Sequence, residues 1–423
     1  TGGIFCVDNG RNRHHPGTES AMKWIRSALL GVPLAVIAAA FLPWPQTEYP
    51  VQCNATEDCA IKINAAYANC VAGGGGNVRL HGGVLMRVSG VTGINGACGI
   101  IGVPPQFYLS GESQNCKFVP GMTGTHILQT DPSKPAFDLA ITASGAVMQY
   151  ITIHQDHGSD STFTTPIAFQ PAIQTAAASG GAGLRLSDIT FCEVVDGLRF
   201  GNPNGVGSGL NAVSNIYGAA FGSLVRVEAA GDFTHMSNIV GQPWLLASQP
   251  NKLAYMRAHM VAYESRRSDA PYVSNVDCYS CNICVLISYA GVITNSTWGL
   301  KIGRINCDRG WSALYVNGHG VTVHVDSIFF TGAPWASNTN AVLCYLGCLV
   351  DVGTINALDV SGSVIYAFNE MDFSDITAAV VHAAHCVGST FYAHGNGQIT
   401  VYGRYTAWDC PTVSGGTGTV TIK

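Results

Sequence analysis

A short pattern recurs along this chain at intervals that only a few architectures produce. The pattern has four consecutive positions: an apolar residue, then Ser, then Asn or Asp, then Ile or Val. It occurs at 186–189, 213–216, 236–239, 273–276 and 373–376. Looser copies centre on Ile305, Ile328, Ile355 and Ile399. From Ile189 onward, successive centres are 27, 23, 37, 29, 23, 27, 21 and 23 residues apart. Periods of about 20 to 50 residues indicate solenoids or propellers.

The length and composition of the repeat select one kind of solenoid. A propeller blade needs about 40 residues, which most of these intervals lack, and the Leu ladder of a leucine-rich repeat is missing. Each unit instead contains short runs of Ile, Val, Phe and Thr between Gly, Asn or Asp turns, as in Val321–Val325. Three short strands in about 23 residues make one coil of a parallel β-helix. We therefore expect an all-β chain.

The low charge of the chain agrees with this architecture. Only 11% of residues are charged, against about 25% in an average globular protein, while 47% are hydrophobic and 50 are Gly. Disordered chains and long coiled coils are excluded, because both are rich in charge. A nucleic-acid partner is not expected, since the net charge is -5 and phosphate binding needs a basic surface.

The first 50 residues differ from the rest of the chain. Lys23 and Arg26 precede an apolar run from Ala28 to Leu42, and the segment from Met22 to about Leu42 resembles a secretory signal peptide. An attachment segment is the alternative, because 21 residues precede Met22. We expect residues 1–50 to be a leader and 51–423 to be one β-helix domain. With a signal peptide, the protein would be secreted or displayed at a cell surface.

The fifteen cysteines suit an oxidising compartment, because all but one can pair. Cys278, Cys281 and Cys284 first suggest a metal cluster. A structural zinc site needs a fourth ligand, and no nearby ligand pair supplies one. In a strand Cys281 would also face away from Cys278 and Cys284. We therefore expect disulfides or core-filling thiols here, and no metal site.

The region after the leader resembles a known group of proteins. An amphipathic segment at 57–68 is followed by a Gly-rich turn and strand at 73–85, by Gly99–Gly102 and by Leu109–Ser113. This order is similar to the entry region of the pectate-lyase-like superfamily, which includes phage tailspikes and polygalacturonase-related proteins. The resemblance extends to 232–239 and to Pro243-Trp244. It implies a right-handed parallel β-helix capped by a short N-terminal helix, a polysaccharide partner and, as in many tailspikes, a homotrimer.

Two intervals are too long for one coil and predict loops that leave the helix. They are the 37-residue interval between Ile239 and Val276, and the stretch from Gln155 to Gly183. Loops on a rigid scaffold are common places for binding and catalysis. The sequence 154–160, with two His and two Asp, could bind a divalent cation through imidazole and carboxylate groups, or could simply be a polar loop.

Because charge is scarce, its clusters are the candidates for catalysis. Glycoside hydrolysis needs two carboxyl groups across the scissile bond. Glu264 and Asp269 could form that pair, or either could act with Asp232 or Asp308 from a neighbouring coil. His319 lies in a Gly-His-Gly sequence like that of the polygalacturonase family and is a further catalytic candidate.

A second set of residues is expected to hold the substrate. Arginines at 266, 267, 304 and 309 could form a cationic strip for an anionic sugar, and Trp244 and Trp311 could offer flat faces to sugar rings. The sequence thus favours hydrolysis of a polysaccharide in a surface groove, without a cofactor. One alternative is a polysaccharide lyase acting on a uronate polymer, for which a divalent cation such as Ca²⁺ would be compatible. The other is a non-catalytic glycan-binding protein of a virion or cell surface.

Overall fold

The computed structural model describes residues 47–104, 116, 118, 123–139, 146–175, 183–201, 209, 211–228, 234–268, 271–288, 297, 299–411 and 415–423, excluding the side chains of 369–373. Residues 47–423 form one compact unit. The leader through Gln46, the predicted strand at 109–113, Asp232 and Asp269 lie outside the described residues. The signal peptide therefore stays a prediction. Within the described part of the chain, no helix is long and apolar enough to cross a membrane.

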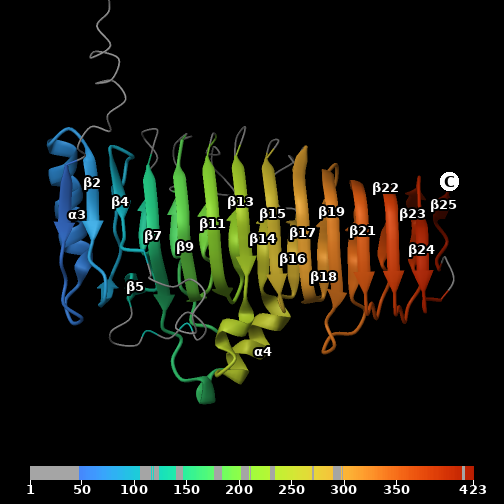
Figure 1. Ribbon diagram of the computed structural model, residues 1–423, viewed down its shortest axis with the longest axis horizontal. Coiled ribbons are helices and arrows are strands. Elements are labelled where there is room, and N and C mark those ends of the chain that lie inside the picture. Colours follow the sequence, from blue (N-terminus) through green and yellow to red (C-terminus); the bar gives the residue numbers. More distant parts are fainter. Residues whose placement is uncertain are drawn as a thin grey trace, which may run out of the picture. The chain divides into compact units, whose positions relative to one another are not determined.

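Every strand pairing among the described residues is parallel, and long strands alternate with short ones (Figure 1). The first strands are β1 (Glu48–Val51), β2 (Gly76–Leu80), β3 (Leu85–Val88), β4 (Cys98–Ile101), β5 (Thr125–Gln129) and β6 (Phe137–Leu139). The long strands are β7 (Val147–Gln155), β9 (Arg185–Val194), β11 (Ala212–Ala220), β13 (His235–Gly241), β15 (Tyr272–Tyr279), β17 (Leu300–Gly310), β19 (Thr322–Gly332) and β21 (Leu349–Leu358).

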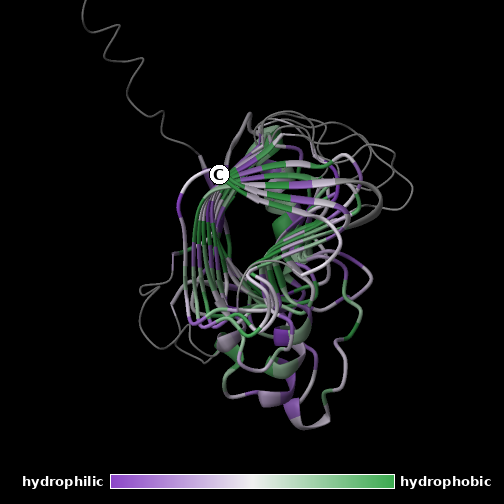
Figure 2. Cartoon of the chain, turned by 90° about the vertical axis from the view of Figure 1, so that its right-hand side faces the viewer, coloured by the Kyte–Doolittle hydropathy of each residue, from purple (hydrophilic) through white to green (hydrophobic). Residues whose placement is uncertain are grey.

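The short strands are β8 (Ile173–Thr175), β10 (Leu198–Phe200), β12 (Ser223–Val227), β14 (Val261–Ser265), β16 (Ile283–Ser288), β18 (Ser312–Asn317) and β20 (Asn340–Tyr345). The C-terminal strands are β22 (Ile365–Ala384), β23 (Phe391–Val401), β24 (Tyr405–Trp408) and β25 (Thr419–Ile422). Each short strand pairs with the next short strand, as β14 does with β16, and each long strand pairs with the next long strand, as β15 does with β17. This is the predicted parallel β-helix, and Figure 2 looks along its stacked coils.

The recurring Asn or Asp of the sequence pattern marks a bend in three successive long strands, β9, β11 and β13. Asp188, Asn215 and Asn238 have positive φ angles of 56°, 54° and 57°, a conformation that Asn and Asp tolerate better than most residues. Their side chains form a ladder from coil to coil: Asn215 Nδ2 donates to Asp188 Oδ1 at 2.9 Å, and Asn238 Nδ2 donates to Asn215 Oδ1 at 2.8 Å. The repeat can therefore be recognised in the sequence, because the Asn or Asp at each of these bends forms a hydrogen bond with the equivalent side chain of the neighbouring coil.

The predicted spacing gives the correct register until Ile355. Ile189, Ile216, Ile239, Val276, Ile305, Ile328 and Ile355 pair in that order. The next predicted centre is wrong, because Ile355 pairs with Val381, whereas Ile376 pairs with Val350. A long strand has buried apolar residues at more than one position along its length, as β21 has at Val350 and Ile355. The 21-residue interval therefore runs from the later of these positions in one coil to the earlier one in the next. Ile376 and Ile399 are again partners.

A helix covers the first coils, as the sequence predicts. Helix α3 (Cys59–Ala72) follows Asp58, whose carboxylate accepts a hydrogen bond from the Ala60 N–H at 3.0 Å. It packs against β1, β2, β3 and β4 and lies at one end of the stack (Figure 1). The disulfides Cys53–Cys59 and Cys70–Cys98 fasten both of its ends. The helix thus shields the apolar ends of the first coils from water.

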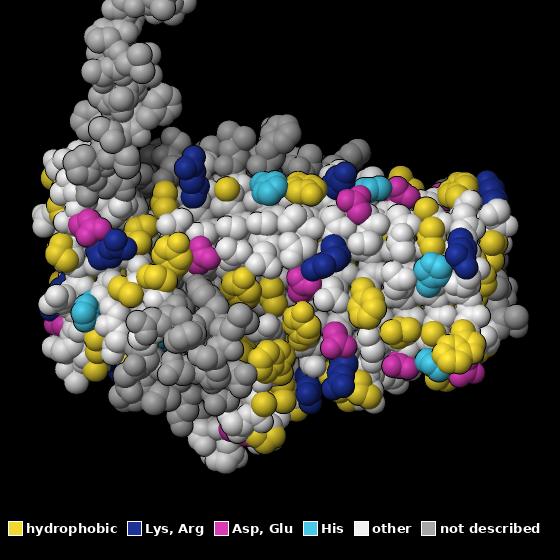
Figure 3. Space-filling view, viewed as in Figure 1, with side chains coloured by type: hydrophobic (Ala, Val, Ile, Leu, Met, Phe, Trp, Pro, Cys, Tyr) yellow, Lys and Arg dark blue, Asp and Glu magenta, His cyan; other side chains and the backbone are white. Residues whose placement is uncertain are grey.

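The interior is a continuous column of Ile, Val, Leu and Phe side chains, with Ile189, Ile216 and Ile305 completely buried. On the face seen in Figure 3, charged side chains are isolated spots among uncharged side chains and backbone. Besides the two pairs at α3, disulfides join Cys116–Cys192, Cys344–Cys348 and Cys386–Cys410. This agrees with the expectation that most cysteines pair.

Candidate functional site

Two chain segments leave the coils at one corner of the β-helix, where long strands lead into short strands. The first follows β7 and contains the short helix η2 (Asp160–Thr162), and the second follows β13 and contains η3 (Pro243–Leu246) and α4 (Pro250–His259). The Asp160 carboxylate accepts hydrogen bonds from the N–H groups of Asn251 and Lys252, the latter at 2.9 Å. The two predicted loops are therefore confirmed, and they are fastened to each other.

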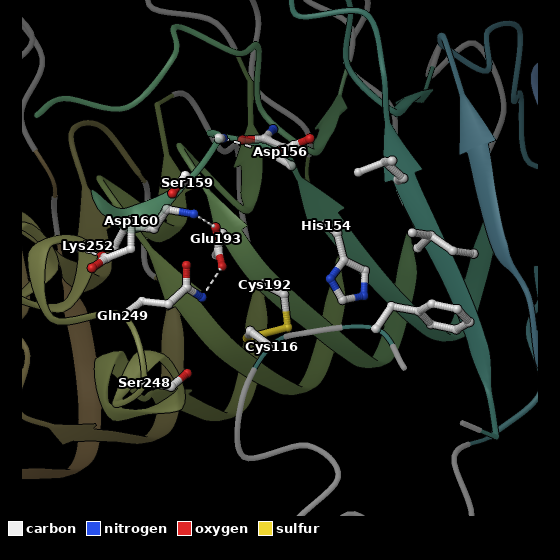
Figure 4. A pocket seen from close by; sticks show the side chains of 15 residues that line it. Cys116, His154, Asp156, Ser159, Asp160, Cys192, Glu193, Ser248, Gln249 and Lys252 are labelled. Atoms are coloured by element: carbon white, nitrogen blue, oxygen red, sulfur yellow. Dashed lines mark hydrogen bonds and ion pairs between the residues drawn. A yellow bond between two sulfur atoms is a disulfide. The ribbon is translucent and has the colours of Figure 1, made fainter. Parts of the chain in front are cut away.

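A pocket of about 590 Å³ lies beneath these segments (Figure 4). Its polar lining comes from the end of β7, the end of β9 and the start of α4: His154, Gln155, Asp156, Ser159, Asp160, Glu193, Ser248, Gln249 and Lys252. Its apolar lining is Leu85, Phe118, Leu128 and the Cys116–Cys192 disulfide. The pocket is large enough for a small organic ligand.

The ionic groups of the pocket bind each other. Lys252 Nζ lies 2.6 Å from Glu193 Oε2, and Gln249 Nε2 donates to Glu193 Oε1 at 2.6 Å. Burial, with a further contribution from His126, lowers the pKa of His154 to about 3, and one ring nitrogen of each histidine lies 3.1 Å from the other. His154 is therefore neutral at pH 7.

The sequence 154–160, suggested as a cation site, is divided among several contacts. His157 Nδ1 accepts a hydrogen bond from the Ile167 N–H at 2.9 Å, and its ring packs edge-on against Phe221. Asp156 accepts a hydrogen bond from the Gly158 N–H, also at 2.9 Å. Together with the helix-capping Asp160, these contacts match the alternative interpretation of a polar loop.

A second candidate surface runs along the outside of the short strands. Side chains that follow one another in register from coil to coil are Arg199, Arg226, Glu264, Leu286, Tyr315, Leu343, Tyr366 and Tyr392. A neighbouring column holds Asn317, Tyr345, Phe368 and His394. We call these columns, with the adjoining Asp196, Glu228 and Arg266, the outer strip. Seven coil steps of about 4.8 Å separate Arg199 from Tyr392, so the strip is about 34 Å long.

The first half of the outer strip is a closed network of charges. Glu264 lies between two arginines, with Arg226 Nε 2.7 Å from Oε2 and Arg266 Nε 2.7 Å from Oε1. Arg226 also binds Asp196 at 2.8 Å. Arg266 binds Glu228 at 3.1 Å, and Glu228 binds Arg199 as well. Three arginines and three carboxylates thus neutralise each other.

Glu264 is the most strongly perturbed acid in this network. Its side chain is 4% exposed. Burial alone would raise its pKa, but Arg226, Arg266 and the Ser223 hydroxyl outweigh that effect and lower the pKa to about 2. Glu264 is consequently ionised at pH 7 and holds no proton that it could donate to a glycosidic oxygen.

The second half of the outer strip is aromatic. The rings of Tyr366 and Tyr392 stack with centroids 4.7 Å apart, and Phe368 and His394 stack at 5.0 Å. Tyr345 joins both columns, at 5.1 Å from Phe368 and 5.7 Å from Tyr366. All five rings are partly exposed.

Tyr315 extends the aromatic half toward the charged half. Its ring lies 5.9 Å from Tyr345 and 5.8 Å from Trp311, edge-on in both cases. Burial, with smaller contributions from the neighbouring phenols, raises the pKa of both Tyr315 and Tyr366. Their hydroxyl groups are therefore protonated hydrogen-bond donors at neutral pH.

The residues predicted to be catalytic do not form one cluster among the described residues. Glu264 lies in β14, Asp308 near the end of β17, and His319 in the turn after β18. Glu264 and Asp308 are two coils apart, which is about 10 Å along the axis before any sideways separation. That spacing alone reaches the upper limit of the range of about 5 to 9.5 Å for a catalytic carboxyl pair, and any sideways separation adds to it.

The predicted binding residues are spread over four places. Arg266 belongs to the charged half, and the half-buried Arg267 follows it in the chain. Arg304 binds Asp277 at 3.3 Å, and Arg309 ends β17 with a positive φ of 57°. Trp311 contacts the aromatic half through Tyr315, whereas Trp244 lies in η3 and packs against the core.

The aromatic half was missed by sequence reasoning, which searched for charges. A detectable signal existed, because aromatic residues recur at the length of one coil: Tyr345 and Phe368 are 23 residues apart, and Tyr366 and Tyr392 are 26 apart. Reading that signal requires the register of the coils, which places these side chains on one outer face.

Comparisons with known proteins find similarity at the level of structure alone. No family model matches the sequence, and no curated protein matches it. The A-module of the mannuronan C-5 epimerase AlgE6 from Azotobacter vinelandii is 11% identical, with a TM-score of 0.40 over 89% of this chain and 98% of that chain. The tailspike protein of E. coli bacteriophage HK620, solved with a pentasaccharide, is 11% identical, with a TM-score of 0.47 over 88% of this chain and 76% of that chain. Both are parallel β-helix proteins, and parallel β-helix is the architecture that the strand pairing of this chain itself shows.

Proposed function

We propose that this protein binds a polysaccharide along the outer strip, and that the aromatic half supplies the main binding surface. The observation that carries this proposal is the set of partly exposed aromatic rings that contact one another on successive coils. These rings run from Tyr315 through Tyr345 and Tyr366 to Tyr392. A rigid row of partly exposed aromatic rings, repeated at the spacing of the coils, suits a repeating ligand that has apolar C–H groups.

The phenol groups add polar recognition to this apolar surface. Tyr315 and Tyr366 keep their protons, because burial raises the pKa of each. The Tyr315 hydroxyl can donate a hydrogen bond to a sugar hydroxyl, and the Tyr366 hydroxyl, which already interacts with Tyr345, can accept one. Three coil steps separate Tyr315 from Tyr392, about 14 Å, so the aromatic half can contact a short oligosaccharide segment.

The charged half supports binding rather than cleavage. Hydrolysis requires a carboxylic acid that carries a proton at working pH, whereas the pKa of Glu264 is about 2. A lyase requires a cation that is free to neutralise a uronate, whereas Arg226 and Arg266 each bind two carboxylates. We therefore propose a glycan-binding role for this network, in which its polar atoms contact sugar hydroxyl groups.

The disulfides support a location outside a reducing cytosol. Five pairs are present among the described residues, and such pairs persist in oxidising environments. A secreted or cell-surface protein fits this best, and a virion tail protein is the alternative. The homotrimer implied by the family resemblance stays a prediction.

Binding to a panel of neutral and uronate-containing polysaccharides tests the proposal. The variant Y366A/Y392A should lose most of the retardation that the wild-type chain shows in affinity gels with the bound polymer. Y402A is the matched control, because Tyr402 is 56% exposed and lies outside the strip. Equal retardation of Y366A/Y392A and wild type would contradict the proposed surface.

The same incubations should be assayed for products in two separate channels. Reducing ends report hydrolysis, and absorbance from unsaturated uronates reports lyase action. We expect neither signal to rise above that of a heat-denatured sample. Release of products by the wild-type chain would contradict a purely binding role, whichever polymer is cleaved.

A further inference from the structure

Four buried cysteines form a cluster inside the β-helix. Cys278 lies in β15, Cys281 in the turn that follows, Cys284 in β16 and Cys307 in β17. All four are free thiols and at most 1% exposed. The remaining ten cysteines in the described part of the chain are joined in disulfides.

The fold, rather than the local sequence, brings these sulfurs together. Cys278 and Cys307 are register partners in adjacent coils. The Sγ atoms of Cys278, Cys284 and Cys307 all lie within 4.8 Å of one another. The Cys281 thiol interacts with that of Cys278. Three sulfurs therefore converge on one point of the interior, and the Cys281 sulfur lies next to that of Cys278, outside the group of three.

Two glycines make room for this convergence. A Cβ atom at Gly241 would lie 2.8 Å from the Cys281 sulfur, and one at Gly310 would collide with the Cys307 sulfur. Any larger residue at either position would have to displace a sulfur of the cluster. The backbone around the cluster is thus shaped to accommodate it.

Two structural features were not visible to the sequence argument that found no fourth ligand. Strand β15 ends at Tyr279, and Ser280 has a φ of 67°. The chain turns there, so Cys281 does not continue the strand alternation that would point it away from Cys278. Cys307 comes from the next coil, 23 residues after Cys284, where a search for short-range ligand spacing would not find it.

The arrangement matches what a tetrahedral thiolate site requires. Zn²⁺ in structural sites binds four ligands, with Zn–S distances of about 2.3 Å, which places sulfurs about 3.8 Å apart. The limit of 4.8 Å holds for the sulfurs of Cys278, Cys284 and Cys307, which need a contraction of about 1 Å or less, and the Cys281 sulfur would complete the set by moving toward them from its place beside Cys278. Soft thiolate ligands favour zinc over hard cations. Four neighbouring thiols in an oxidising compartment would otherwise be expected to form disulfides.

We propose that Cys278, Cys281, Cys284 and Cys307 bind one zinc ion inside the β-helix. The ion would be acquired during folding, because the closed coils bury all four ligands. It would join β15, β16 and β17 where the outer strip passes from Glu264 to Tyr315. This inference does not depend on the proposed glycan binding.

Metal analysis of the full chain, produced with zinc in the medium and dialysed against metal-free buffer, tests the site. We expect one zinc per chain. Cobalt(II) added during refolding should give the intense visible bands of a tetrahedral thiolate site. C307S should lose most of the zinc, whereas C386S/C410S, which removes a disulfide elsewhere, should retain it. Retention of zinc by C307S would overturn the proposal.

A thiol count keeps the test decisive if C307S fails to fold. Wild-type protein denatured with a chelator should release one zinc and titrate five thiols, the four of the cluster and that of Cys6. A single thiol would mean that the cluster is two disulfides. Five thiols without metal would mean that it is a packed core, and iron in place of zinc would identify a different site. Each of these three results would overturn the zinc assignment.

Discussion

Replacing Glu264 by Gln tests whether the charged half of the outer strip is a preformed, mutually neutralised network. Gln has nearly the same shape as the protonated acid but cannot carry the negative charge that Arg226 and Arg266 face. The side chain of Glu264 is 4% exposed, so water cannot replace the lost attraction. We expect E264Q to destabilise the folded state at neutral pH.

The size and pH dependence of this effect follow from the pKa shift. The pKa of Glu264 falls from an ordinary value of 4.5 to about 2, and one pKa unit corresponds to about 1.4 kcal/mol. The ionised carboxylate thus contributes about 3 kcal/mol. Because the folded-state pKa is depressed, this contribution is complete above pH 4.5 and is lost as the pH falls toward 2.

Urea unfolding of both proteins at several pH values measures the effect. The difference in unfolding free energy between wild type and E264Q should be about 3 kcal/mol at pH 7 and should shrink steadily below pH 4.5. E48Q is the control, because Glu48 forms an exposed ion pair with Arg79, and such pairs contribute at most about 1 kcal/mol. A difference for E264Q that is no larger than that for E48Q, or that does not change with pH, would refute the reasoning.

Three other features give separate expectations. N238A should lower the melting temperature, because it removes the hydrogen bond to Asn215 and puts Ala in a left-handed conformation, at a combined cost of about 2 kcal/mol; N238G, which tolerates the conformation, should be milder. D160A should remove the cap of α4 at a cost of about 1 kcal/mol and speed proteolysis at Lys252, and unchanged cleavage would exclude the capping role. Because burial lowers the pKa of His154 to about 3, the folded state should lose stability as the pH falls from 6.5 toward 3, and H154Q should show a flatter profile in the same range.

The fold could be predicted because its dominant interactions repeat in the sequence. Asp188, Asn215 and Asn238 occupy one bend per coil, and the Ile that follows each one is buried in the same column. The prediction failed at Ile376, where two inward levels of one long strand could not be told apart by spacing. A periodic pattern therefore predicts the number of residues in a coil more reliably than it predicts where along a long strand a given buried residue lies.

The candidate surfaces were harder to predict, because they depend on contacts between coils. The charge of Glu264 and Arg266 was visible, but Arg226, which pairs with Glu264, comes from the preceding coil, 38 residues away. That pairing converts an expected acid into a permanently ionised group. Likewise Cys307 joins the cluster only through the register of β15 and β17.

Oxidative footprinting of the tyrosines, with and without a saturating polysaccharide from the binding panel, tests the central claim most directly. The account predicts that Tyr315, Tyr366 and Tyr392 become protected from hydroxyl radicals, while Tyr402 reacts at an unchanged rate and serves as the internal control. Binding of the polysaccharide with no protection of these three strip tyrosines would contradict it.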